Sequence, residues 1–120
     1  MSYFAIATQR FEAMLDFYQH RLGLEVISQF DRPTARGAFI RLGNDARMEL
    51  IDATRQKNRM TLAEAADDRL HIVIETRDVN SFAREKSLPE PRPTSWGASV
   101  VEIRDPDNIS VWVLQWLKPE

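Results

Sequence analysis

The sequence of 120 residues contains no cysteine, and this absence excludes both a disulfide framework and a thiolate metal site. It has no basic cluster, and its net charge is only −2, so the electrostatic footprint of a nucleic-acid-binding protein is missing. No apolar run approaches the length that crosses a bilayer, and no export signal precedes the first apolar segment. We therefore expect a cytoplasmic protein with no nucleic-acid partner and no membrane partner.

What is present is the balance of an ordinary globular protein. Hydrophobic residues make up 43% of the chain and charged residues 28%, which is enough apolar surface for a folded core. The length predicts a single domain over residues 1–120, or two small halves that share one core.

Short apolar segments bounded by turn residues predict strands, and two segments with helical spacing predict helices. The helices are expected over 9–22, with Gly23 ending the first, and over 79–87, with Asp78 as N-cap. The segment 87–93 contains three prolines and predicts a loop or a weak edge strand. The remaining strands are expected at 3–8, 24–30, 35–42, 47–52, 69–76, 98–104 and 109–116.

The order of these elements repeats. Each half reads β-α-β-β-β, which suggests duplicated modules that bury one shared surface. We expect module one over residues 1–53, a linker over 54–68 and module two over 69–120.

Strand alternation separates an aliphatic face from a mixed one. Met48 and Leu50 share one face of their strand, whereas Arg47 and Glu49 share the other. A mixed face of this kind either lines a partly wet cavity or is a solvated sheet face. The last strand differs because both of its faces are apolar, so Trp112 must be covered by a half-barrel, another subunit or a ligand.

Four segments carry a family resemblance: "FYQHRLGLEV", "MEL", "HIVIETRDV" and "WGASVVEIRDPDN". In this order they resemble the glyoxalase/bleomycin-resistance/extradiol-dioxygenase superfamily, which has the vicinal-oxygen-chelate fold. The resemblance implies an α+β fold with two βαβββ modules forming curved mixed sheets around a cavity. Small members of this superfamily usually dimerise, so the resemblance also implies a homodimer.

The resemblance further implies four metal-ligand positions, which are Tyr3, Glu49, His71 and Trp112. Glu49 and His71 match the pattern, but Tyr3 replaces a histidine or glutamine, and Trp112 replaces a glutamate. An indole N–H only donates hydrogen bonds, and a neutral phenol with a pKa near ~10 is a poor ligand. We therefore expect no cofactor, with a divalent metal as the alternative.

Three interpretations of the predicted cavity remain open. In the first, it binds a flat or cationic small molecule, such as an antibiotic, without chemistry. In the second, Glu49 and His71 are a catalytic acid–base pair that works without a metal. In the third, that pair is structural. A metal-dependent enzyme of the glyoxalase or dioxygenase type is a further alternative, and if the protein is an enzyme we expect the lyase/isomerase or dioxygenase type. The predicted ligand-binding residues are Tyr3, Phe39, Arg47, Trp96 and Trp112.

Overall fold

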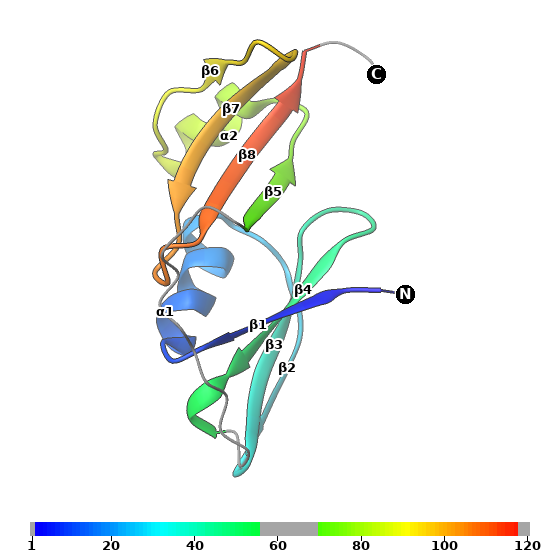
Figure 1. Ribbon diagram of the computed structural model, residues 1–120, viewed down its shortest axis with the longest axis vertical. Coiled ribbons are helices and arrows are strands. Elements are labelled where there is room, and N and C mark those ends of the chain that lie inside the picture. Colours follow the sequence, from blue (N-terminus) through cyan, green and yellow to red (C-terminus); the bar gives the residue numbers. More distant parts are fainter. Residues whose placement is uncertain (1, 56–69, 118–120) are drawn as a thin grey trace. The chain divides into compact units, whose positions relative to one another are not determined.

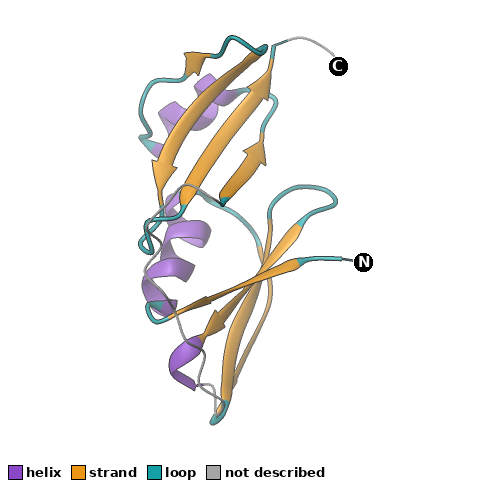
Figure 2. Ribbon diagram, in the orientation of Figure 1, coloured by secondary structure: helices purple, strands orange, loops and turns teal. Residues whose placement is uncertain are grey.

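The computed structural model describes residues 2–55 and 70–117. Contacts divide the chain into two compact units, an N-terminal unit of residues 1–65 and a C-terminal unit of residues 66–120. Each unit contains one four-stranded sheet and its own helical segment (Figure 2). Most of the predicted linker, 54–68, lies outside the described residues.

The N-terminal unit forms a mixed sheet with the strand order β1-β4-β3-β2 (Figure 1). Strands β1 and β4 are parallel, and the other neighbours are antiparallel, including β3 and β4. Its elements are β1 (Phe4–Thr8), α1 (Phe11–Asp16), the π-helical turn η1 (Phe17–Arg21), β2 (Val26–Arg32), β3 (Ala35–Arg41), β4 (Arg47–Asp52) and the 3-10 turn η2 (Ala53–Arg55).

The C-terminal unit repeats this arrangement with the order β5-β8-β7-β6. Strands β5 and β8 are parallel, and β8 pairs with β7 in the antiparallel direction. The expected weak strand is the two-residue β6 at the sheet edge. The predicted α+β fold with two βαβββ modules is thereby confirmed. The elements are β5 (His71–Glu75), α2 (Val79–Lys86), β6 (Arg92–Pro93), β7 (Ala98–Arg104) and β8 (Ser110–Trp116).

The helices of the two units begin differently. The Asp78 carboxylate caps α2 by accepting a hydrogen bond from the Ser81 backbone N–H at 3.0 Å, as the sequence predicts. Arg10 precedes α1 and offers no side-chain cap. The predicted single helix over 9–22 is a short α-helix that continues as the π-helical turn η1, and Gly23 follows it with a φ of 70°. None of the described helices is both long and apolar enough to cross a membrane.

The core of each unit lies between its helix and one sheet face. In the C-terminal unit, Val79 and Ala83 of α2 pack with Val101 of β7 and Val113 of β8, and α2 crosses this face in Figure 1. In the N-terminal unit, Met48 and Leu50 of β4 are fully buried. The opposite sheet faces carry the aromatic and charged residues that the sequence singles out.

Candidate functional site

The hydrogen-bond register shows which residues occupy equivalent positions in the two sheets. Glu49 is the third residue of β4 and pairs with Phe39 of β3. Trp112 is the third residue of β8 and pairs with Glu102 of β7. At corresponding positions of the two sheets, the acid and the aromatic residue are therefore exchanged.

The N-terminal unit brings Tyr3, Phe39 and Arg47 together. The rings of Tyr3 and Phe39 meet edge to face with centroids 5.1 Å apart. The Arg47 guanidinium lies over both, 5.2 Å from the Tyr3 ring centroid and 5.4 Å from that of Phe39. Cation–π attraction thus engages the arginine that the sequence assigns to a ligand. Glu49 shares this face and is half-buried.

The C-terminal unit brings together the other predicted residues, His71, Trp96 and Trp112. The His71 and Trp112 ring centroids are 4.6 Å apart. Trp96 stacks on Trp112 at 6.4 Å with an interplanar angle of 26°. Trp96 also meets Trp116 edge to face at 5.5 Å. Because 49% of Trp96 and 38% of Trp116 are exposed, this aromatic cluster of His71, Trp96, Trp112 and Trp116 offers π surface to solvent.

Two carboxylates orient the indoles of this cluster, and sequence reasoning missed both roles. The Trp112 Nε1–H donates to Glu102 Oε2 at 2.8 Å, and the Trp116 Nε1–H donates to Glu75 Oε1 at 2.8 Å. Both glutamates are exposed, so they add negative charge at the edge of the aromatic cluster. Glu102 is the cross-strand partner of Trp112. The register of these two predicted strands was therefore the sequence signal that could have identified the contact.

Three buried side-chain atoms have no hydrogen-bond partner within residues 2–55 and 70–117: Arg47 Nε, His71 Nδ1 and Ser110 Oγ. Arg47 is the first residue of β4, and Ser110 is the first residue of β8. His71 is the cross-strand partner of Ser110. Both sheets therefore leave hydrogen-bonding capacity unused at the start of their last strand.

At two of the four predicted ligand positions the side chain is a poor ligand for a divalent metal ion. Trp112 uses its only polar atom to donate to Glu102, and the Tyr3 ring lies beneath the Arg47 cation. In the part of the chain that the structure describes, no group of three or more histidine, aspartate or glutamate side chains is placed to hold a metal. Catalytic metal sites commonly use about three protein ligands.

Glu49 and His71, the predicted catalytic pair, belong to different units. Each residue is described within its own unit, and their pairing stays a prediction. Within its unit, neither residue has a hydrogen-bonded acid–base partner among the described side chains.

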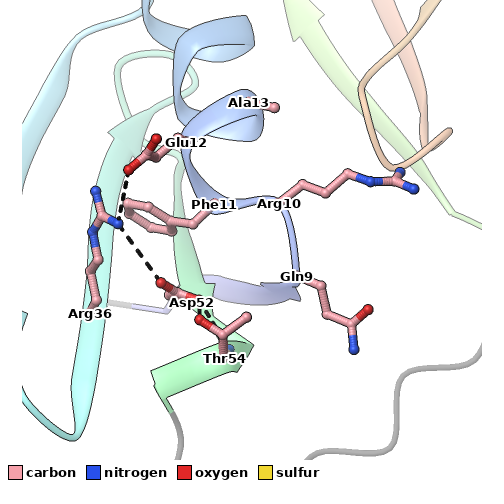
Figure 3. Close-up of a pocket in the computed structure, with 8 residues that line it drawn as sticks. All are labelled: Gln9, Arg10, Phe11, Glu12, Ala13, Arg36, Asp52 and Thr54. Carbon is pink, nitrogen blue, oxygen red and sulfur yellow. Dashed lines mark hydrogen bonds and ion pairs between the residues drawn. The ribbon is translucent and has the colours of Figure 1, made fainter.

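A separate pocket of about 290 Å³ lies beside the start of α1 (Figure 3). The Arg36 guanidinium there contacts Glu12 at 3.5 Å and Asp52 at 3.9 Å and lies 4.6 Å from the Phe11 ring centroid. These contacts already occupy the charged groups, so we assign them to packing of α1 against the sheet. None of the predicted site residues lines this pocket, whose walls are Gln9, Arg10, Phe11, Glu12, Ala13, Arg36, Asp52 and Thr54.

A known protein family matches most of this chain. The family model of the Glyoxalase/Bleomycin resistance protein/Dioxygenase superfamily matches residues 1–113. No curated protein sequence matches the chain.

Solved structures share the fold. A glyoxalase/bleomycin resistance protein/dioxygenase from Nocardioides is 18% identical, with a TM-score of 0.70 and coverage of 100% of this chain and 85% of that chain. TnmS3, an antibiotic binding protein from Streptomyces sp. CB03234, is 19% identical, with a TM-score of 0.64 and coverage of 97% and 96%. A glyoxalase I mutant from Zea mays is 17% identical, with a TM-score of 0.70 and coverage of 94% and 46%. At these identities the likeness establishes the fold alone.

Proposed function

The chain belongs to the glyoxalase/bleomycin resistance protein/dioxygenase superfamily, and from this premise we propose that it binds flat, cationic aromatic small molecules without a metal ion. The observation that carries the proposal is the aromatic cluster of the C-terminal unit, in which His71, Trp96 and Trp112 lie in ring contact. The fold is shared with a protein that is described as antibiotic binding, which supports small-molecule binding as the kind of function.

Exposed π surface in the C-terminal unit favours an aromatic ligand. Trp96 is half-exposed, yet it is aligned with Trp112 in a stacked geometry. Stacking of an aromatic ligand on an indole contributes about 0.5–1.5 kcal/mol beyond the area that is buried. Because the Trp112 N–H is fixed by Glu102, the ring is oriented before a ligand arrives.

The two carboxylates of the aromatic cluster favour a cationic ligand. Glu75 and Glu102 each accept an indole N–H with one oxygen and lie at the edge of the exposed rings. A cation stacked on tryptophan is attracted by the ring quadrupole as well as by neighbouring carboxylates. Arg104 lies 3.9 Å from the second oxygen of Glu102, so the negative charge of Glu102 is partly offset and that of Glu75 is the stronger attraction.

Tryptophan fluorescence tests this proposal. We expect N-methylquinolinium, a flat cation, to quench the emission in a saturable titration and to bind more tightly than the anion 2-naphthalenesulfonate. Trp96→Leu removes an exposed stacking ring and should weaken the binding of N-methylquinolinium about five- to tenfold. The other two tryptophans still report on binding in that variant.

The charge contribution is isolated by Glu102→Gln. Glutamine keeps an oxygen that accepts the Trp112 N–H but removes the negative charge, so N-methylquinolinium should bind about two- to fivefold more weakly. Glu85→Gln on α2 is the matched control for net charge and should leave the affinity unchanged. Equal affinity for the cation and the anion, or no saturable quenching by either, contradicts the proposal.

The proposal includes a homodimer, as the family resemblance implies. Sedimentation equilibrium tests this part separately, since a mass of one chain at all concentrations contradicts it and leaves ligand binding intact.

A further inference from the structure

We propose that Ser110 and His71 form a hydrogen-bonding anchor for the hydroxyl group of an aromatic ligand whose ring stacks on Trp112. The inference rests on the proposed function and adds a chemical group to the ligand class. It assigns a role to Ser110, a residue that neither the sequence pattern nor the aromatic geometry singles out.

The first step is the isolation of the Ser110 hydroxyl. Ser110 is 1% exposed, and its Oγ has no hydrogen-bond partner among the side chains and backbone that the structure describes. A buried hydroxyl without a partner costs about 1–3 kcal/mol. Native structures contain few such groups, and each one calls for an explanation.

The second step is that His71, the neighbour of Ser110, also has a buried atom without a hydrogen-bond partner among the described residues. His71 is the cross-strand partner of Ser110 in the parallel β5–β8 pair, so both side chains lie on the same sheet face. The His71 Nδ1 atom is also buried and also lacks a partner within the described ranges. Two adjacent polar groups therefore have unused hydrogen-bonding capacity at one place.

Another buried polar group in the same unit has hydrogen-bond partners. Ser110 Oγ and His71 Nδ1 differ from it in having none among the described residues. Asp105 is 5% exposed, and its Oδ1 accepts the backbone N–H groups of Asp107 and Ile109 at 2.9 Å each. The Asp105 carboxylate in the turn between β7 and β8 thus has hydrogen-bond partners, whereas the Ser110 hydroxyl at the start of β8 has none among the described residues.

The third step is the position of this pair beside the aromatic cluster. The His71 ring centroid lies 4.6 Å from that of Trp112, and Trp112 is on the same face of β8 as Ser110, two residues further along. The two unpartnered atoms therefore lie on the face of the sheet that carries the aromatic cluster, next to Trp112.

A hydroxyl group is the substituent that suits both atoms. The serine hydroxyl both donates and accepts, and His71 Nδ1 does one or the other according to its tautomer. A ligand hydroxyl donates one hydrogen bond and accepts another, so it can satisfy both groups at once. A methyl ether keeps the acceptor but has no hydrogen to donate, so it leaves one of the two groups without a partner.

Isothermal titration of the full chain with 2-naphthol and with 2-methoxynaphthalene tests the anchor. The two probes share an uncharged bicyclic ring and differ in the O–H group. We expect 2-naphthol to bind about tenfold more tightly, which corresponds to one net hydrogen bond. In Ser110→Ala this preference should fall to about twofold or less, while the affinity for 2-methoxynaphthalene stays within about twofold.

Two further variants keep the test decisive. His71→Phe preserves a ring against Trp112 and should also abolish the preference, which covers the case that Ser110→Ala does not fold. Ser99→Ala is the matched control, because Ser99 pairs with Gln115 on the opposite face of the same sheet and its loss should leave the preference at tenfold.

The outcomes separate this inference from the proposed function. If N-methylquinolinium binds but 2-naphthol and its methyl ether bind equally well, the anchor is wrong and the aromatic binding function stands. A tenfold preference that survives in Ser110→Ala and His71→Phe also overturns the anchor. If none of the aromatic probes binds, the proposed function fails and the anchor fails with it.

Discussion

The two units build the same sheet and place opposite chemistry on it. The third residue of the last strand is Glu49 in the N-terminal unit and Trp112 in the C-terminal unit, and their cross-strand partners are Phe39 and Glu102. In the C-terminal unit the acid accepts the indole N–H at 2.8 Å. In the N-terminal unit the aromatic ring has no polar atom to offer, so Glu49 gains no such partner.

This exchange shows how one repeat produces two kinds of surface. Where the acid and the tryptophan are paired, the carboxylate orients an extended aromatic cluster. Where the acid stands beside a phenylalanine, the cation Arg47 covers the rings instead. The comparison makes the C-terminal unit the better candidate for binding a flat cation, because its indoles and carboxylates lie together, whereas Arg47 of the N-terminal unit is already engaged by two rings.

The largest expected effect comes from the contrast between the two faces of β4. Leu50 is fully buried, and Leu50→Ala should lower the free energy of unfolding by about 2–5 kcal/mol through lost burial and the cavity that remains. Glu49→Ala, at the adjacent position on the opposite face, should change it by no more than about 0.5 kcal/mol. Urea denaturation measures both values, and similar losses in the two variants would contradict this assignment of faces.

The next effect tests a position at which the two sheets carry residues of different size. Gly37 on β3 occupies the register position that Val100 occupies on β7. A Cβ at Gly37 would lie 2.6 Å from Phe30 Cζ and 2.8 Å from the Leu50 carbonyl oxygen. The ring can rotate but the backbone oxygen cannot, so Gly37→Ala should destabilise the protein by about 1–3 kcal/mol.

Gly43→Ala is the control for this substitution, because no atom lies within 4 Å of the added Cβ. Thermal unfolding of both variants decides the outcome. A melting temperature for Gly37→Ala equal to that of Gly43→Ala would show that the sheet accommodates the methyl group.

A smaller effect should distinguish the two helices. Hydrogen bonds from the Ser81 backbone N–H and from its hydroxyl lower the pKa of Asp78, and Arg84 lowers it further. A carboxyl whose pKa is lower in the folded state stabilises the fold above its ordinary pKa, and this contribution is lost as the pH falls through the folded-state pKa. Asp78→Ala should therefore lower the melting temperature at neutral pH.

The difference in melting temperature between wild type and Asp78→Ala should shrink in acid. Asp78→Asn keeps a side-chain oxygen that caps the helix without titrating in this range, so it should retain most of the stability. Arg10→Ala, at the uncapped start of α1, should have little effect at any pH. A wild-type advantage that grows as the pH falls would reverse the expected sign.

Much of the fold could be predicted from the sequence, because strand alternation and turn residues are local signals. The strands at 47–52 and 98–104 have the predicted bounds, and Asp78 caps α2 as its spacing indicates. The π-helical turn after Asp16 was not predicted, since amphipathic spacing does not distinguish a π turn from an α-helix.

The candidate site was less predictable, because it depends on pairing across strands. Alternation placed Glu49 on a mixed face and Trp112 on an apolar face of the last strand, but the role of Glu102 required the register of β7 against β8. The role of Glu75 required a partner 41 residues away. No sequence pattern indicates that Ser110 is buried without a partner, because burial of a small polar residue depends on what surrounds it in three dimensions.

The central claim is that an indole in place of a metal-binding carboxylate makes this protein a binder of organic cations. The most direct measurement is the melting temperature with N-methylquinolinium, compared with Zn²⁺, Ni²⁺, Mn²⁺ and Fe²⁺. We predict a rise with N-methylquinolinium that corresponds to about 2.7 kcal/mol at 100 times its Kd, and no change with the metal ions. A rise with any of these ions, together with no response to the organic cation, would contradict the claim.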